Sequence, residues 1–281
     1  MDPSPSANSA NGAAGLVHHM DHFVLPVMDP ERAEKFYLDV MGGRLLKRMA
    51  DPSVTRLFIK VGQNHVGLFS QSKAALPQPE TPDGFPRYGF VAPAGEFENM
   101  AEKIRAASPL KKTIEKKGIA TGCGADEGVV FADSEGNLLE LLRGGSEGPT
   151  RLDHLHFDTL DLAASVRFYT EILKFSLLER DHGLAVMGVP SRQSIVLHEV
   201  AELSPVTRTA YRGRHYAFNV TDEDFHAIVA RLRQAGIDER DDHGEREGRR
   251  PEQLGTYFKE PSGFRLQITN EDSATFAAHA A

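Results

Sequence analysis

The stretch DHLHFDTLDLAASVRFY (Asp153–Tyr169) decides the fold, because it lies without a gap over DHFVLPVMDPERAEKFY (Asp21–Tyr37). His154 matches His22 in this overlay, and both stretches close on Phe-Tyr. Near the end of each half, FADSEGNLLELL (131–142) lies over FKEPSGFRLQIT (258–269) in the same way. Two similar pairs in the same order predict that the halves of the chain duplicate one another.

Each half divides again into two smaller modules. The opening stretch reads as a strand and then a helix, since Asp29 suits the N-cap and Pro30 the first helical position. Weaker copies start at YGFVAP (88–93) and HYAFNV (215–220), and each leads into apolar residues at helical spacing. We therefore expect four modules, at about 18–75, 85–143, 151–202 and 212–270.

The expected fold class is α+β, with four tandem βαβββ modules that form two cupped-sheet domains, each a pair of half-barrels. The N-terminal two-module domain covers residues 17–148 and is expected to be metal-free, and the C-terminal one covers 149–272. Residues 1–16, rich in Ser, Ala, Asn, Pro and Gly, are typical of a disordered leader, and 273–281 form a tail.

Composition narrows the function classes. The 281 residues are 40% hydrophobic and carry a net charge of −8 without a long basic tract, which argues against a nucleic-acid partner. No apolar run approaches the ~20 residues that cross a bilayer, and no signal pattern opens the chain, so we expect a cytoplasmic protein. Since Cys123 is the only cysteine, a metal must use His, carboxylate or amide ligands.

Alternation along three predicted strands places polar residues on one face. In 153–157 the histidines His154 and His156 point away from the apolar residues, and His215 does so in 214–218. Gln267 likewise lies opposite its apolar neighbours in 265–269. If the apolar sides pack beneath the helices, these four side chains share the concave face of one sheet. Polar groups left there without a partner would cost ~1–3 kcal/mol each, so we expect a wet cavity or a bound ion.

The D-H strand, the Asp-capped helix ending in F-Y and the P-S-G turn at 261–263 resemble the vicinal oxygen chelate superfamily of glyoxalases, fosfomycin-resistance proteins and extradiol ring-cleavage dioxygenases. The resemblance covers nearly the whole chain after residue 17. Carried over from two-domain extradiol dioxygenases, it implies a metal site of His154, His215 and Gln267, where Gln267 replaces the glutamate of the family. It also implies Fe(II), with Mn(II) or Zn(II) as alternatives.

The resemblance also assigns two catalytic residues. Tyr257 stands ten residues before Gln267, the spacing at which the family has a substrate-binding tyrosine. His243 is the nearby candidate for the second-sphere histidine of the family, although a stretch around RRPEQ separates it from Tyr257.

The first half has His22, Arg87 and Glu140 at the corresponding positions, and an arginine does not bind a metal because it stays protonated. Arg87 is therefore expected to pair with a buried Glu140. A second pairing of modules is also known in the superfamily, namely second with third and first with fourth. It would bring Glu140 near His154 and near His198, and the sequence leaves both pairings open.

Three functions are consistent with these features. The first, placed slightly ahead, is an extradiol-type dioxygenase that opens a catechol-like ring; the second is a glyoxalase-like lyase, isomerase or hydrolase that uses a divalent metal as a Lewis acid. The third is a metal-free binding or resistance protein. All three have a small-molecule partner, and the resemblance leaves a homo-oligomer open, since dimers are common among relatives.

Overall fold

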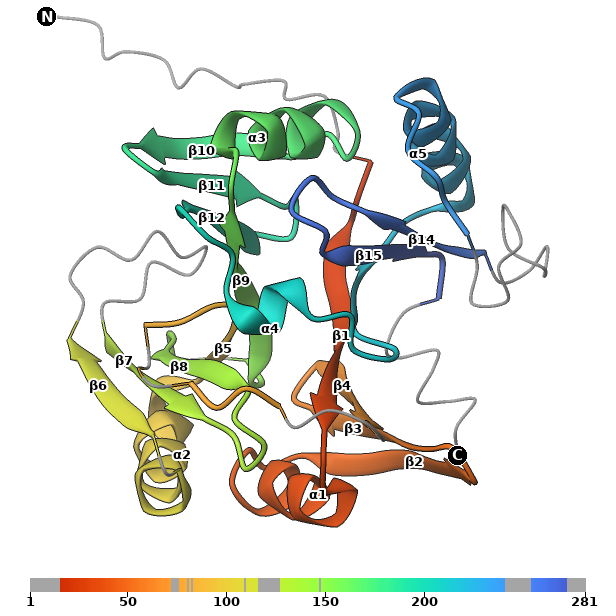
Figure 1. Ribbon diagram of the computed structural model, residues 1–281. Coiled ribbons are helices and arrows are strands. Elements are labelled where there is room, and N and C mark those ends of the chain that lie inside the picture. Colours follow the sequence, from red (N-terminus) through yellow and green to blue (C-terminus); the bar gives the residue numbers. More distant parts are fainter. Residues whose placement is uncertain are drawn as a thin grey trace, which may run out of the picture.

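The computed structural model describes residues 16–71, 76–79, 81, 83–108, 110–115, 127–146, 148–240 and 254–271. Most of the expected leader, the tail at 273–281 and His243 lie outside the described residues. Within them the α+β class is confirmed, because the chain folds into two mixed sheets with helices packed on them (Figure 1).

One sheet has seven strands in the order β14-β15-β13-β1-β4-β3-β2. We call it the β1 sheet. Its strands are β1 (His19–Val27), β2 (Arg44–Asp51), β3 (Val54–Val61), β4 (Asn64–Ser70), β13 (His215–Asn219), β14 (Gly255–Lys259) and β15 (Arg265–Thr269). The other, the β9 sheet, has eight strands in the order β10-β11-β12-β9-β5-β8-β7-β6. Its strands are β5 (Arg87–Ala92), β6 (Lys111–Glu115), β7 (Glu127–Ala132), β8 (Leu138–Arg143), β9 (Arg151–Thr159), β10 (Ser176–Asp181), β11 (Leu184–Gly188) and β12 (Ser194–Glu199).

This strand order joins the first module to the fourth and the second to the third. The opening strand β1 pairs antiparallel with β13 of the fourth module, with Phe23 opposite Tyr216. In the same way β9 pairs antiparallel with β5 of the second module. The expected division into domains 17–148 and 149–272 is therefore corrected, since neither half forms a sheet of its own. The structure has the second of the two pairings that the sequence left open.

The helices bury the faces that the sequence indicated. Asp29 caps α1 (Pro30–Asp39) by accepting hydrogen bonds from the backbone N–H groups of Glu31 and Arg32. Thr221 caps α5 (Asp222–Gln234) through the N–H of Asp224. The remaining helices are α2 (Ala94–Ala107), α3 (Leu162–Glu171) and the short α4 (Pro205–Arg208), and the four longer helices bury apolar residues in one continuous core.

The two sheets meet through aromatic side chains of their central strands. Phe23 stacks on Tyr88 with ring centroids 4.7 Å apart, and the hydroxyls of Tyr88 and Tyr216 are hydrogen-bonded at 3.0 Å. Phe157 stacks in turn on Phe264. Because alternate residues of a strand point to opposite faces, the polar residues next to these aromatics project away from the seam. Each sheet thus carries its histidines on the face turned away from the other sheet.

Candidate metal centre

A row of polar side chains crosses the β1 sheet. His22 on β1 is registered with His65 on β4 and with Ala217 on β13. Ala217 is in turn registered with Gln267 on β15. Side chains at registered positions of neighbouring strands project to the same side, and so does His215, two residues before Ala217. We call His22, His65, His215 and Gln267, together with Asp21, the β1 cluster.

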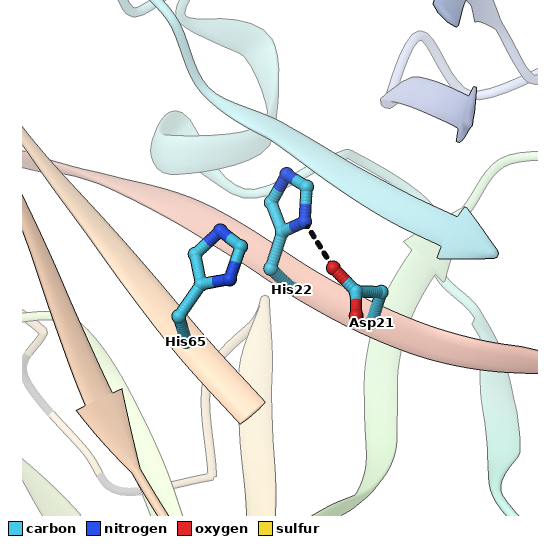
Figure 2. A group of neighbouring side chains, drawn as sticks. All are labelled: Asp21, His22 and His65. Atoms are coloured by element: carbon cyan, nitrogen blue, oxygen red, sulfur yellow. Dashed lines mark hydrogen bonds and ion pairs between the residues drawn. The ribbon is translucent and has the colours of Figure 1, made fainter. Parts of the chain in front are cut away.

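The imidazoles of this cluster are oriented by oxygen acceptors. The ring of His22 bonds through Nδ1 to a carboxylate oxygen of Asp21 at 2.7 Å, and it stacks on His65 with centroids 4.2 Å apart (Figure 2). His215 Nδ1 bonds to the carbonyl oxygen of Gly213 at 2.6 Å. The Nε2 atoms of His22 and His215 face each other at 3.2 Å. Tying one ring nitrogen to an oxygen is how proteins aim the other nitrogen at a metal.

The donor set fits a divalent cation. With Nδ1 donating to oxygen, neutral rings of His22 and His215 present two lone pairs to each other, which repel unless a proton or a cation lies between them. Two nitrogen ligands of one ion stand about 3 Å apart when each bond is ~2.1 Å, close to the separation seen here. The side-chain oxygen of Gln267 is buried without a hydrogen-bond partner among the described residues, as a further ligand would be.

The charge states of the cluster suit metal binding. Burial lowers the pKa of His65 and of His215 well below the usual value, with the neighbouring His22 adding to the effect. Both rings are therefore neutral and retain a lone pair at neutral pH. Burial opposes the charge of Asp21, but hydrogen bonds from His19 and His22 outweigh it and hold the pKa of that carboxyl far below its ordinary range. Asp21 thus stays ionised behind His22.

Tyr257 lies at one side of the β1 cluster. It is registered with Gln267, and its ring contacts that of His215 edge-on with centroids 5.1 Å apart. The guanidinium of Arg265 lies over the Tyr257 ring at 3.9 Å. Tyr257 and Gln267 are half-buried, whereas His215 is buried. A small molecule approaching from this side would meet the tyrosine and a cationic side chain next to the imidazoles.

The β9 sheet carries a second polar group, which we call the β9 cluster: Arg87, Glu140, Asp153, His154 and His156. Glu140 Oε2 lies 3.5 Å from His154 Nε2, 3.3 Å from His156 Nε2 and 3.5 Å from Arg87 Nε. The expected pairing of Arg87 with Glu140 is confirmed, and so is the approach of Glu140 to His154 that the second module pairing implied. His156 Nδ1 lies 2.8 Å from a ring nitrogen of His198.

The β9 cluster balances its charges internally. His154 and Glu140 are fully buried. Burial disfavours the charged form of His154, but hydrogen bonds to Asp153 and Glu140 overcome it and raise the pKa to about 9. Burial alone would likewise raise the pKa of Glu140, whereas hydrogen bonds from His154 and His156 hold it well below the usual value. Two cations, Arg87 and His154, therefore face two carboxylates.

The two clusters occupy equivalent positions of the duplicated fold. The row Gln267, Ala217, His22 and His65 in the β1 sheet matches the row Glu140, Gly89, His154 and Ser194 in the β9 sheet. His215 corresponds to Arg87, as the sequence repeat indicated. Gln267, His22, His65 and His215 thus give the β1 cluster four side chains with a possible ligand atom. In the β9 cluster the position of His215 is taken by the permanent cation Arg87, and that of His65 by Ser194.

The predicted metal ligands are consequently divided. His215 and Gln267 lie in the β1 sheet, whereas His154 lies in the β9 sheet, because β13 pairs with β1 and not with β9. His22, which the sequence reading assigned to a half without a metal, occupies the position expected for His154. Tyr257 lies beside His215 as expected, and His243 is outside the described residues.

Sequence reasoning missed His65 and Asp21. The signal for His65 was present, because it alternates with the buried apolar Val66 and Leu68 in NHVGLFS (64–70). Asp21 was quoted only as half of a D-H pair, and its hydrogen bond to the adjacent His22 ring gives that pair a physical meaning.

Comparison with known proteins agrees with this fold. The model of the Glyoxalase/Bleomycin resistance protein/Dioxygenase superfamily matches residues 19–141 and 151–268, and the chain therefore belongs to this superfamily. A Salmonella typhimurium virulence protein is 28% identical over 122 residues, covering 42% of this chain and 83% of that protein. The glutathione transferase FosA of Serratia marcescens is 30% identical over 118 residues, covering 42% of this chain and 78% of FosA.

Solved structures extend the likeness to the whole chain. A candidate dioxygenase from Bacillus subtilis has a TM-score of 0.71 at 17% identity, covering 95% of this chain and 89% of that one. Glyoxalase I from Zea mays has a TM-score of 0.63 at 20% identity, covering 93% and 95%. At these identities the likeness establishes the fold and leaves the reaction to the site. No helix in the described part of the chain has the length and apolar character to span a membrane.

Proposed function

We propose that this protein is a metal-dependent enzyme acting on a small oxygenated molecule, with one divalent ion held in the β1 cluster by His22, His215 and Gln267. The observation that carries the proposal is the 3.2 Å approach of two Nε2 atoms whose rings are each fixed by an oxygen acceptor. The side-chain oxygen of Gln267, buried without a hydrogen-bond partner in the described part of the chain, supports it. His65, stacked on His22, is placed to be a fourth ligand.

The residues of the cluster have separate tasks. A divalent ion at this position would act as a Lewis acid that binds two neighbouring oxygens of the substrate and polarises a carbonyl or an enolate. Asp21 holds the ring of His22 in orientation and keeps its Nδ1 protonated. The Tyr257 ring lies beside His215 on the substrate side, and Arg265 above that ring favours an anionic substrate.

The uncharged donors favour Lewis-acid chemistry, that of a lyase, isomerase or hydrolase, over oxygen activation. Non-haem Fe(II) enzymes that activate dioxygen use two histidines and one carboxylate. Gln267 replaces that carboxylate, so the ion keeps its whole charge of two, which makes it a stronger electrophile and disfavours oxidation of an iron centre. On this ground we place the Lewis-acid reaction ahead of the ring-cleavage reaction that the sequence analysis placed slightly ahead.

Ring cleavage remains the second candidate, supported by one observation. Tyr257 contacts the ring of His215, as expected for the substrate-binding tyrosine of an extradiol dioxygenase. Oxygen uptake distinguishes the two candidates. With the Fe(II)-loaded protein and a panel of catechols, stoichiometric oxygen consumption would establish ring cleavage, and its absence would leave the Lewis-acid reaction.

The first test is the metal content of gently purified protein. We expect about one divalent ion per chain, lost in His22→Ala and in His215→Ala. The matched control is His154→Ala, which removes the equivalent histidine of the β9 sheet and should retain the ion. The proposal fails if the wild-type protein takes up no divalent ion, which would favour the metal-free binding protein, or if a His154→Ala protein that is folded by circular dichroism is the only variant to lose it.

A further inference from the structure

A cavity of about 430 Å³ lies at the seam of the two sheets, apart from both histidine clusters. Its walls come from the end of β1 at Pro26, the start of β5 at Tyr88, the start of β8 at Leu138 and the segment around α4. In Figure 1, α4 is seen between β1 and β9, in front of this seam. None of the described residues that line the cavity belongs to the β1 or the β9 cluster.

Prolines and hydrogen bonds hold the walls of the cavity in place. Five prolines line the cavity: Pro26, Pro77, Pro79, Pro86 and Pro205. The α4 segment is fixed to β9, because Asp158 accepts hydrogen bonds from the Ser204 N–H at 2.6 Å and from the Thr207 hydroxyl at 2.5 Å. Arg214 donates to the carbonyl oxygens of Val206 and Thr207 and so ties the same segment to the residue before β13. A preformed cavity costs a ligand little ordering entropy.

The residues that line the cavity disfavour a charged ligand. Among the described residues around the cavity none is Lys, Arg or His, so an anionic ligand would find no partner. The only acid, Glu135, has both oxygens engaged: it accepts hydrogen bonds from the N–H groups of Met28 and Asp29 and from Arg32 Nε. Glu135 therefore binds residues at the start of α1, and its carboxylate oxygens are already engaged and do not attract a cationic ligand.

A buried hydroxyl of the lining is placed for recognition. Among the described residues the buried Tyr211 hydroxyl has no partner at hydrogen-bond geometry, although the Thr209 hydroxyl is near enough to lower its pKa. The Thr209 hydroxyl donates its own hydrogen to the carbonyl oxygen of Pro205 at 2.7 Å. By contrast, the hydroxyl of Tyr88 is already bonded to Tyr216. A buried hydroxyl without a partner is unfavourable, and a ligand oxygen would relieve this.

We propose that this cavity is a second ligand site, independent of the metal centre, for a neutral, apolar molecule with an oxygen that accepts a hydrogen bond from the Tyr211 hydroxyl. The volume falls within the range of pockets that hold small organic molecules. Since the site shares no residue with the β1 cluster, ligand binding there can be tested separately from the proposed enzyme function.

The test uses Prodan, a neutral naphthyl ketone whose emission shifts to the blue in apolar surroundings. We expect saturable one-site binding to the wild-type protein, and binding at least tenfold weaker for the similarly sized anion 1-anilinonaphthalene-8-sulfonate. Tyr211→Phe should weaken Prodan binding about fivefold, the factor that corresponds to one hydrogen bond of ~1 kcal/mol. Val206→Trp, at a half-buried position of the wall, should abolish binding by filling the cavity.

Two controls keep the result decisive. Leu160→Trp adds a tryptophan at an exposed position away from the cavity, in a chain that has none, and should bind Prodan as the wild type does. His22→Ala should do the same, which separates this site from the metal centre. If Val206→Trp does not fold, Leu76→Trp fills the cavity from the opposite wall. Absence of saturable binding, or equal affinity in a folded cavity-filling variant, overturns the site, and unchanged affinity in Tyr211→Phe overturns the recognition by that hydroxyl.

Discussion

Gly89 packs directly against the imidazole of His154 in the β9 cluster, so a single added methyl group would disturb this packing. A Cβ added at Gly89 would lie 2.1 Å from Cε1 of His154, 2.3 Å from its Nε2 and 2.5 Å from its Nδ1. The imidazole therefore lies flat across the glycine. It has no room to withdraw, because it is fully buried and bonded to Asp153 on one side and to Glu140 on the other.

Gly89→Ala should therefore destabilise the protein strongly. Overpacking of a buried site costs ~1–3 kcal/mol, and removing one partner of a buried ion pair costs ~3–5 kcal/mol. Because both penalties arise from the same displaced ring they are not independent, and we expect a loss of about 3–5 kcal/mol in the free energy of unfolding. The control is Ala217→Gly at the equivalent position of the β1 sheet. It should lower the free energy of unfolding by ~1 kcal/mol, because glycine loses more backbone freedom on folding than alanine does.

Urea denaturation followed by circular dichroism measures both variants. A double variant, Gly89→Ala/His154→Ala, tests the cause, because the alanine at position 89 should cost almost nothing once the ring is absent. If Gly89→Ala costs less than ~1 kcal/mol, or the same with and without the His154 ring, the imidazole is not held as described and the reasoning is refuted.

Three further predictions concern charge and binding. The pKa of His154 is about 9 in the folded protein against its usual 6.5, so the stability that this histidine contributes is complete below pH 6.5 and is lost as the pH rises through about 9. The free energy of unfolding of the wild type should fall by about 3 kcal/mol across this range. An equal slope in His154→Gln would contradict this prediction. Gln267→Glu adds a negative charge to the β1 cluster and should tighten metal binding at least tenfold in a competition titration with a chelator, whereas unchanged affinity would remove Gln267 from the ligand set. Tyr257→Phe should keep the metal content and weaken the binding of 4-nitrocatechol, a chelating probe, to the loaded protein about fivefold; loss of the metal instead would make Tyr257 structural.

The sequence was sufficient for the modules because their signals are local. A D-H pair in a strand, an aspartate cap and helical spacing each involve residues a few positions apart, and all of them recur in the structure. The alignment of His22 with His154 also holds, since both occupy the same position of the duplicated sheets.

The pairing of modules could not be read from the sequence because it depends on contacts between distant strands. His22 and His215 are 193 residues apart, and nothing in their flanking residues distinguishes a first strand that pairs with the next module from one that pairs across the chain. His215 and Gln267 do lie in one sheet, but the histidine beside them there is His22 and not His154. That these side chains bind a metal stays a prediction.

The cross-pairing of modules also orders the events of biosynthesis. Residues 87–199 contain all the strands of the β9 sheet that the structure describes, so this sheet can form before β13, β14 and β15 of the β1 sheet are translated. Strands β1 to β4, by contrast, are translated before the β9 sheet, but one edge of β1 stays unpaired until β13 has been translated. Contacts between strands so far apart in the sequence form slowly. Until they form, the β1 edge lacks its neighbouring strand, and unpaired edges of this kind promote aggregation. The site that brings His22 and His215 together therefore forms only after β13 has been synthesised.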